Sequence, residues 1–326
     1  MPFNVYVTRQ IPEAGLAILR EHCDRVDVSP QDCPLDRRVF LAQVKGRDGV
    51  VCQLTDLVDE EVLQAAGPQC RVFANFGVGF NNIDLEAATR HGALITNTPG
   101  ILSDTTADLA WSLMLSVARR IVESDRYCRS GKWTGFSPML FLGHDIHGAT
   151  LGIVGAGRIG TAAGLRSTGF NMKLLYFDDR ENDVLNKVGG KRVGLGTLLQ
   201  ESDFVSLHVP LLDSTYHMIG RDALAMMKPT AYLINTARGP VVDEQALVEA
   251  LREKRIAGAG LDVYENEPEL APGLAELENV VCIPHLGSAT HATRSRMSVM
   301  VAQNVVAALK GETPPNLVNT DVAKDT

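Results

Sequence analysis

The chain has 326 residues, which is enough for two domains of ordinary size, each with its own core. Its 45% hydrophobic and 21% charged residues are typical of a soluble globular protein and exclude a disordered chain. The formal charge of -8 provides no broad positive field, so we expect no nucleic acid as a partner.

The chain carries no signal for a membrane or for export. No run reaches the roughly 18 apolar residues of a membrane span, and the N-terminus "MPFNVYVTRQ" lacks the layout of a signal peptide. Six cysteines stand singly, without a spacing that suits a metal. We expect a cytoplasmic protein with no membrane partner, no metal and reduced thiols, most of them buried.

The first hundred residues alternate short β-branched runs with amphipathic patterns. Strands are expected at 4–8, 47–53, 71–76 and 93–97, and helices at 12–22, 59–67 and 84–92. Such alternation is typical of βαβ units, which build a parallel sheet covered by helices on both faces.

Residues 104–130 are predicted to form one long helix, apolar on more than one side, that connects two domains. A second series of strands follows at 150–154, 171–177, 203–209, 231–237, 256–263 and 280–285. The last predicted helix covers 292–311 and is expected to be stopped by the prolines of "ETPPNLVN". Two α/β units result, the first of them discontinuous and completed by the C-terminus.

The passage "LGIVGAGRIG" places Gly155, Gly157 and Gly160 between a strand and an amphipathic helix. The first glycine allows a tight turn, the second lets the backbone approach a pyrophosphate, and the third lets helix and strand pack closely. Asp178 ends the next predicted strand, where a carboxylate can bind a ribose. The pattern predicts a dinucleotide site.

From about Asp48 to Asn319 the chain resembles the D-isomer-specific 2-hydroxyacid dehydrogenase family, and most closely its glyoxylate/hydroxypyruvate reductase branch. The passages that match are "NFGVGFNNIDLEAATRHGALITNTPG", "LGIVGAGRIG", "MKPTAYLINTARGPVVDEQAL", and "GLDVYENEP" followed by "VVCIPHLGSAT". The resemblance implies two Rossmann-like doubly wound parallel-sheet domains. Residues 1–102 and 288–326 would bind the substrate, and residues 103–287 would bind NAD.

The resemblance implies three catalytic residues. Arg238, in "NTARG", would bind the carboxylate of a 2-oxo acid with two parallel hydrogen bonds. His285, in "PHLGS", would protonate the ketone oxygen, because an imidazole exchanges protons near neutral pH. Glu267, before the proline of "DVYENEP", would orient His285 and favour the imidazolium.

The same resemblance implies different roles for the other two acids of "GLDVYENEP". Asp262 matches the residue that holds the nicotinamide carboxamide, while Glu265 is left without a role and is expected to be solvated. The histidines in helix or loop contexts, such as His217 and His291, are expected to be structural.

Further binding residues follow from the matched positions. Small residues in "NFGVG" expose successive main-chain N–H groups suited to a carboxylate, and we assign Val78 and Gly79 to the substrate together with Arg238 and His285. The positions matched to cofactor-lining residues are Thr106, Gly155, Gly157, Arg158, Ile159, Gly160, Asp178, Val209, Pro210, Thr236, Ala237, Asp262, His285 and Gly287.

Two features depart from the branch. Many of its members carry a small polar residue and an arginine where this chain reads "YFDDR", so Asp178 and Asp179 are expected to repel the 2'-phosphate of NADP(H), although Arg180 could accept it. Trp133 is followed by Phe136, where the branch often has a second tryptophan. We expect the protein to use NAD(H) in preference to NADP(H).

The sequence therefore predicts an NAD-dependent oxidoreductase that reduces a small 2-oxo acid, glyoxylate or hydroxypyruvate first, and forms a homodimer. Three alternatives within the enzyme class are D-lactate, D-3-phosphoglycerate or another 2-hydroxy acid as substrate. From a different class, an NAD-sensing binding scaffold without metabolic turnover stays open.

Overall fold

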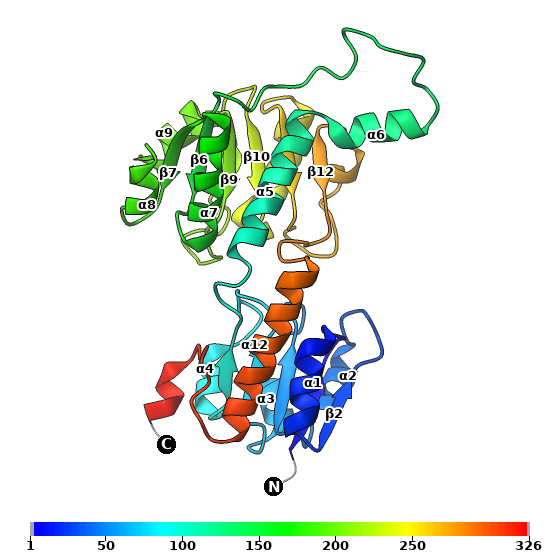
Figure 1. The fold of residues 1–326 in the computed structure, drawn as a ribbon, viewed down its shortest axis with the longest axis vertical. Coiled ribbons are helices and arrows are strands. Elements are labelled where there is room, and N and C mark those ends of the chain that lie inside the picture. The colour runs from blue at the N-terminus through cyan, green and yellow to red at the C-terminus, as the bar shows by residue number, and fades with distance from the viewer. Residues whose placement is uncertain (1–2, 325–326) are drawn as a thin grey trace. The chain divides into compact units, whose positions relative to one another are not determined.

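The computed structural model describes residues 3–324, which divide into two compact α/β units (Figure 1). The first unit contains the chain up to Leu102 together with the chain from Ser288 onward. The second unit contains Ser103–Gly287. The first unit is therefore discontinuous in sequence, as predicted.

The sheet of the first unit has five parallel strands in the order β2-β1-β3-β4-β5. Every residue of β3 and β4 is buried, as expected where helices cover both faces of a parallel sheet. The strands are β1 (Asn4–Val7), β2 (Arg25–Val28), β3 (Gly49–Cys52), β4 (Val72–Asn75) and β5 (Leu94–Thr96).

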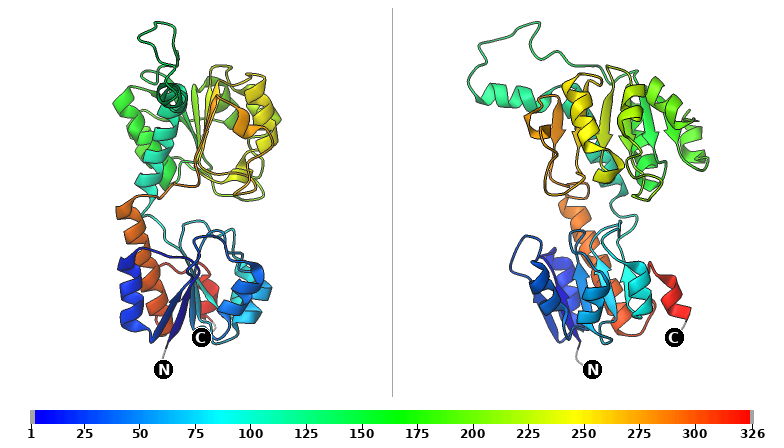
Figure 2. Two further views of the ribbon diagram at one scale, coloured as in Figure 1. Left: turned by 90° about the vertical axis from the view of Figure 1, so that its right-hand side faces the viewer. Right: turned by 180° about the vertical axis from the view of Figure 1, so that it is seen from behind.

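The helices of the first unit lie on both faces of this sheet (Figure 2). Aspartates begin several of them: the side chains of Asp59 and Asp84 accept main-chain N–H groups in the first turns of α3 and α4. The helices are α1 (Glu13–His22), α2 (Arg37–Val44), α3 (Glu60–Ala66), α4 (Leu85–Arg90), α12 (His291–Leu309) and the short 3-10 helix η4 (Thr320–Lys324).

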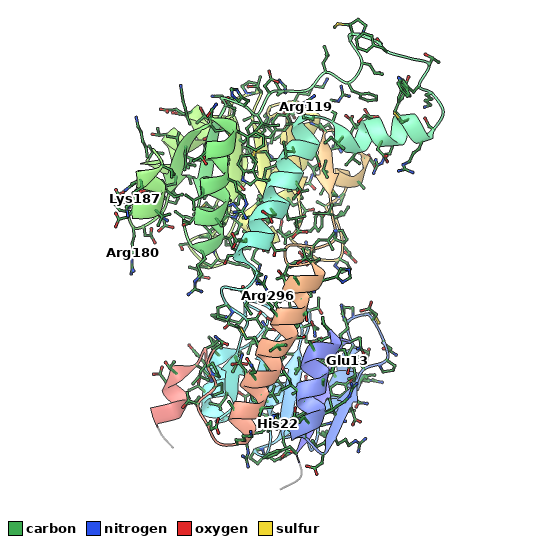
Figure 3. The ribbon with its side chains drawn as sticks, in the orientation of Figure 1. Glu13, His22, Arg119, Arg180, Lys187 and Arg296 are labelled. Carbon is green, nitrogen blue, oxygen red and sulfur yellow. The ribbon has the colours of Figure 1, made fainter. Side chains whose placement is uncertain are left out.

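Helix α12 belongs to the first unit and completes it. It lies beside α1, whose ends Glu13 and His22 are labelled in Figure 3. The two helices are so close that a Cβ on Gly15 would lie 2.2 Å from the carbonyl oxygen of Ser298. Helix α12 ends at Leu309, just before Gly311 with φ 78°, so a glycine ends this helix before the prolines are reached.

The sheet of the second unit has seven parallel strands in the order β12-β11-β10-β9-β6-β7-β8. The order reverses between β6 and β9, which is the switch point of a doubly wound fold and the place where such sheets bind ligands. The strands are β6 (Thr150–Val154), β7 (Lys173–Phe177), β8 (Lys191–Arg192), β9 (Phe204–Leu207), β10 (Tyr232–Asn235), β11 (Gly258–Leu261) and β12 (Val280–Cys282).

Helices cover both faces of this sheet as well (Figure 2). With both units parallel and doubly wound, the predicted fold class is confirmed. The α-helices are α5 (Ser103–Ala118), α6 (Ile121–Arg129), α7 (Arg158–Arg166), α8 (Asp183–Lys187), α9 (Leu195–Glu201), α10 (Arg221–Met226) and α11 (Glu244–Arg252). The 3-10 helices are η1 (Ser167–Phe170), η2 (Gly239–Val241) and η3 (Leu274–Glu276).

The prediction of one helix over residues 104–130 is wrong. The helix is interrupted at Arg120, which adopts φ 53°, and the next helix begins at Ile121. The Ala118 carbonyl is taken by the N–H of His144, and Arg120 pairs with Glu123. Helix α5 packs on β10 and β11, whereas α6 buries none of its residues and leads away from the sheet (Figure 1).

Among the described residues, no helix is both long and apolar enough to cross a membrane. All six cysteines are free thiols, but only half of them are buried, so the expectation that most are buried is wrong. Cys23, Cys52 and Cys70 are buried, and Cys33, Cys128 and Cys282 are exposed.

Candidate active site

The predicted catalytic and cofactor residues of the second unit gather at one edge of its sheet. Because β9, β10, β11 and β12 run parallel, their carboxyl ends meet at the same edge. Val209 and Pro210 follow β9, Thr236 and Ala237 follow β10, Asp262 follows β11, and His285 lies just beyond β12. The glycine loop after β6 ends at this edge too.

The glycine loop has the geometry that a pyrophosphate needs. Gly155 adopts φ 92°, and a Cβ on Gly160 would lie 1.9 Å from the carbonyl oxygen of Gly155, so a side chain is disfavoured at both positions. A Cβ on Gly157 would meet nothing within 4 Å, which leaves the main chain open to a ligand. Arg158 and Ile159 begin α7, whose N-terminus favours an anion.

Asp178 lies directly after β7 and folds back onto the glycine loop. One of its carboxylate oxygens accepts the N–H of Ala156 at 2.8 Å, and the other accepts the N–H of Arg180 at 3.1 Å. Asn182, which no motif in the sequence marks, donates its side-chain N–H to the Ala156 carbonyl at 2.8 Å and so holds the loop from a second side. The acid therefore stands beside the glycine turn, as a ribose ligand requires.

Three neighbouring strand ends each present a buried polar atom that has no hydrogen-bond partner within residues 3–324. These atoms are His208 Nδ1 after β9, Thr236 Oγ1 after β10 and Asp262 Oδ2 after β11. Unsatisfied buried polar atoms cost free energy unless a ligand or water meets them. The set of donors and acceptors fits the amide and ribose of a nicotinamide nucleotide.

The surroundings of Asp262 change the pKa of its carboxyl group. Burial raises the pKa of Asp262 to about 6, against the opposing effects of the Leu286 N–H and the charge of His285. Gly287 closes this region: a Cβ there would lie 3.3 Å from Asp262 Oδ2, and its carbonyl accepts the Thr106 hydroxyl at 3.0 Å. Thr106 and Gly287 thus lie next to the acid expected to bind the carboxamide.

Arg238 follows β10 in a loop shaped by one buried amide. The Asn235 side chain accepts the N–H of Ala237 and donates to the carbonyl of Arg238, both at 3.0 Å, so it fixes the main chain on both sides of Thr236 and Ala237. Burial lowers the pKa of Arg238, whereas the charge of Glu267 raises it. A guanidinium stays protonated under such conditions, so the site holds a cation that lacks its full hydration.

His285 and Glu267 form a hydrogen-bonded pair. Nδ1 of His285 lies 2.9 Å from Glu267 Oε2, and the other oxygen of Glu267 accepts the N–H of Tyr264 at 3.1 Å. Burial acts to raise the pKa of Glu267, but the bond to His285 and the charges of His285 and Arg238 outweigh it and lower the pKa. The carboxylate is therefore ionised and holds the Nδ1 proton, which leaves Nε2 of His285 for chemistry.

The expectation that Glu265 is only solvated is wrong. Its Oε1 lies 2.8 Å from Nε2 of His217, and the Glu265 N–H donates to Glu244 Oε2 at 2.7 Å. His217 lies in the loop before α10, Glu244 begins α11 and Glu265 follows β11, and no motif in the sequence connects the three. The separation along the chain, 48 residues between His217 and Glu265, left no local signal.

Val78 and Gly79 lie in the first unit, in the loop after β4. Their carbonyl oxygens accept hydrogen bonds from the side chains of Asn97 at 2.8 Å and of Asn75 at 2.6 Å. Both residues are half-buried. Two asparagine side chains thus fix the carbonyl oxygens of this loop, and within the described part of the chain neither N–H donates a hydrogen bond.

No group of three or more His, Cys, Asp and Glu side chains that could hold a metal ion occurs within the described residues. The edge of the second sheet presents the imidazole of His285, its carboxylate partner Glu267, the guanidinium of Arg238 and the unpaired polar atoms beside them. Such a set can bind a carboxylate, polarise a carbonyl and deliver a proton.

Comparison with known proteins agrees with this chemistry. The family model described as "D-isomer specific 2-hydroxyacid dehydrogenase, NAD binding domain" matches residues 111–287. A curated relative, the glyoxylate reductase of Korarchaeum cryptofilum, is 52% identical over 325 residues, which cover 98% of this chain and 97% of the relative.

Two solved structures extend the likeness to three dimensions. The glyoxylate reductase from Paecilomyes thermophila has a TM-score of 0.85 at 33% identity and covers 97% of this chain and 98% of its own. The NADPH-dependent glyoxylate/hydroxypyruvate reductase from Sinorhizobium meliloti, in complex with NADP and malonate, has a TM-score of 0.84 at 30% identity, covering 98% and 97%. The chain therefore belongs to the D-isomer specific 2-hydroxyacid dehydrogenase family.

Proposed function

We propose that the protein is an NADH-preferring reductase of small 2-oxo acids, with glyoxylate first and hydroxypyruvate second. The observation that carries the proposal is the His285–Glu267 pair at 2.9 Å, at the same sheet edge as the half-buried guanidinium of Arg238. A proton donor and a carboxylate-binding cation are the two groups that reduction of a 2-oxo acid requires of a protein. The relatives named glyoxylate reductase support the choice of substrate.

Arg238 binds the substrate carboxylate and orients the C2 carbonyl. Its guanidinium presents a planar set of donors that matches a carboxylate, and its partial desolvation strengthens each bond because less water competes. Asn235 fixes the loop that carries it. The bound substrate is thereby held in one orientation, which removes much of the entropic barrier to reaction.

His285 protonates the carbonyl oxygen. Glu267 accepts a hydrogen bond from the Nδ1–H of His285 and stabilises the imidazolium, so Nε2 carries the proton that is transferred. When bound, NADH supplies a hydride to C2 of the substrate. In the reverse direction His285 accepts the proton of the hydroxyl group, so the same pair serves oxidation.

Other residues bind the two ligands. The main-chain N–H groups of Val78 and Gly79 are proposed as a second anchor for the substrate carboxylate. Thr236 Oγ1 and Asp262 Oδ2 are proposed to meet the nicotinamide amide, and Thr106, Val209, Pro210, Ala237 and Gly287 to line its pocket. The loop at Gly155, Gly157 and Gly160, with Arg158 and Ile159, is proposed to bind the pyrophosphate.

The preference for NADH rests on Asp178. Its carboxylate lies beside the glycine loop, 2.8 Å from the Ala156 nitrogen, where it can accept the ribose hydroxyls and oppose an added phosphate. The Sinorhizobium meliloti relative is NADPH-dependent, so the family accommodates both cofactors. Arg180 is the cation that could accept a 2'-phosphate, but it lies at the outer edge of the second unit (Figure 3). We therefore expect only weak use of NADPH.

The oligomeric state and location are also proposed. The segment after α6 exposes the apolar side chains of Trp133 at 57%, Phe136 at 91% and Met139 at 74%. Apolar surface of this kind on a single segment marks an interaction site, and we propose that a second copy of the chain covers it in a homodimer. Six free thiols favour a reducing compartment, the cytoplasm.

A steady-state comparison of glyoxylate, hydroxypyruvate, pyruvate and phosphohydroxypyruvate, each with NADH and with NADPH, tests the proposed function. We expect the highest kcat/KM for glyoxylate with NADH. A preference for pyruvate or phosphohydroxypyruvate would replace the proposed substrate. Tight NADH binding without turnover of any of the four acids would instead support a binding scaffold.

A further inference from the structure

The second unit contains a polar network that joins the loops carrying the two proposed catalytic charges. It consists of His217, Glu244 and Glu265, and none of these three residues belongs to the machinery described above. We propose that this network is a positioning device that sets the separation of Arg238 and Glu267. The proposal rests on the proposed function, because it assigns those two residues their catalytic work.

Glu244 holds the loop that contains Glu267. Glu244 is only 5% exposed, and its two carboxylate oxygens accept the N–H groups of Glu265 at 2.7 Å and of Ala271 at 2.9 Å. These donors lie on either side of Glu267 in the sequence. A single buried carboxylate therefore fixes both ends of the turn from which Glu267 reaches His285.

His217 holds the loop that contains Arg238. Its main-chain N–H donates to the carbonyl of Pro240 at 2.8 Å, and the Ile219 N–H donates to the carbonyl of Val241 at 3.0 Å. His217 adopts φ 49°, a left-handed conformation that non-glycine residues seldom take unless their surroundings fix it. The chain before α10 is thus bonded to the residues that directly follow Arg238.

Glu265 joins these two halves. Its Oε1 lies 2.8 Å from Nε2 of His217, and its Oε2 accepts the N–H of Glu244 at 3.4 Å. The side chains of His217 and Glu265 are 32% and 22% exposed, so the pair is partly shielded from water. Breaking it would separate the support of the Arg238 loop from the support of the Glu267 turn.

The two loops also touch directly, with no space to spare. A Cβ on Gly239 would lie 1.8 Å from the carbonyl oxygen of Tyr264 and 2.4 Å from the nitrogen of Glu265. The residue after Arg238 therefore rests on the main chain that leads to Glu267. Any change that shifts Glu265 must shift Gly239 too, and a displacement of about 1 Å at a reacting centre can cost on the order of 100-fold in rate.

The test uses three variants of the network: Glu265→Ala, His217→Ala and the conservative Glu265→Gln. Their control is a variant of a similar glutamate–histidine pair in the first unit. Glu60 and His91 form a similar pair at 2.6 Å in the first unit, so His91→Ala is the control. We expect Glu265→Ala and His217→Ala to raise the KM for glyoxylate about tenfold and to lower kcat severalfold. The Kd for NADH and the Tm should stay close to those of His91→Ala, which should keep wild-type kinetics.

Glu265→Gln should restore both kinetic constants to within about twofold of wild type. Its amide can donate to His217 and accept from Glu244, so it keeps the geometry without the charge. Hydrogen exchange gives a readout that needs no turnover: residues 236–243 and 262–271 should exchange faster in Glu265→Ala and not in His91→Ala.

The outcomes separate the two proposals. Wild-type kinetics together with unchanged exchange in Glu265→Ala and His217→Ala would overturn the positioning network. A wild-type enzyme that reduces none of the four acids would overturn the proposed function, and in that case faster exchange at both loops would still support the network as the structural link between them.

Discussion

Asp262 Oδ1 accepts a hydrogen bond from the main-chain N–H of Leu286, the residue directly after His285. The main-chain N–H of His285 in turn donates to the Asp262 carbonyl at 2.9 Å. The end of β11 therefore fixes the main chain on both sides of the imidazole, while Asp262 Oδ2 remains for a ligand. One aspartate thus links the proposed proton donor to the proposed nicotinamide site.

Replacing His285 with alanine removes the proposed proton donor. General acid catalysis contributes about 10² to 10⁴ in rate, so kcat for glyoxylate reduction should fall by that order. NADH binding, measured by fluorescence titration, should be largely intact. His291→Ala, an exposed histidine at the start of α12, is the control and should keep wild-type kcat. Near-normal kcat in His285→Ala would remove His285 from the mechanism.

Replacing Glu267 with glutamine should be milder and should change the pH dependence. The carboxylate favours the imidazolium, so its loss disfavours the protonated form that reduction needs. The alkaline limit of kcat for glyoxylate reduction should therefore move to lower pH. A pH profile that superimposes on that of the wild type would count against the pair.

The binding of NADH should weaken in acid because of Asp262. The pKa of Asp262 is raised to about 6 by burial, so its carboxylate is ionised above that pH and protonated below it. Only the ionised form offers both oxygens as acceptors, one to Leu286 and one to the nicotinamide amide. The Kd for NADH should rise as the pH falls through about 6, by up to tenfold per unit.

Asp262→Asn supplies the control for this titration. Asparagine cannot titrate, so its Kd for NADH should be higher at neutral pH and should lack the step near 6. Isothermal titration calorimetry from pH 5 to 8 measures both proteins. A wild-type Kd that stays constant over this range would show that Asp262 does not meet the cofactor.

Replacing Asp178 with serine should narrow or reverse the preference for NADH. Serine offers no negative charge against a 2'-phosphate and accepts ribose hydroxyls less well, so NADH use weakens while NADPH entry becomes easier. The measurement is kcat/KM for both cofactors, with Asp183→Ser at the exposed start of α8 as the control. A wild-type preference for NADPH would show that Asp178 does not govern this pocket.

Replacing both Trp133 and Phe136 with serine should disrupt the homodimer. The two side chains are 57% and 91% exposed on one segment, and their removal deletes apolar surface that a partner would bury. Analytical ultracentrifugation should show a dimer for the wild type and a monomer for the double variant. Leu57→Ser, which changes an apolar residue of the first unit as exposed as Trp133, should stay dimeric. A monomeric wild type would contradict the proposal.

Much of the fold could be predicted because its core strands have a recognisable hydrophobic pattern within a few residues. Strands such as β4 and β10 are buried along their whole length and read as apolar runs between turns. Two of the four edge strands, β2 and β8, could not be found in this way. Strand β2 has no buried residue, and β8 contains only the exposed Lys191 and Arg192, so neither carries a hydrophobic pattern.

The break at Arg120 was hidden for a different reason. Its helical pattern is continuous, and what ends α5 is a distant contact, the N–H of His144 on the Ala118 carbonyl. In the candidate active site, too, residues in local motifs could be predicted and residues held by long-range contacts could not. The motifs predicted His285, Glu267 and Arg238, whereas the buried amides of Asn75 and Asn235 and the pair of His217 with Glu265 depend on contacts that only the folded chain makes.

Helix α12 imposes an order on biosynthesis. The first unit cannot bury the face of α1 until residues 291–309 have left the ribosome, because those residues form the helix that covers it. The second unit is by then fully synthesised, since its last residue is Gly287. Domains fold as units during synthesis, so the N-terminal part of this chain is the last to become complete and depends longest on protection from aggregation.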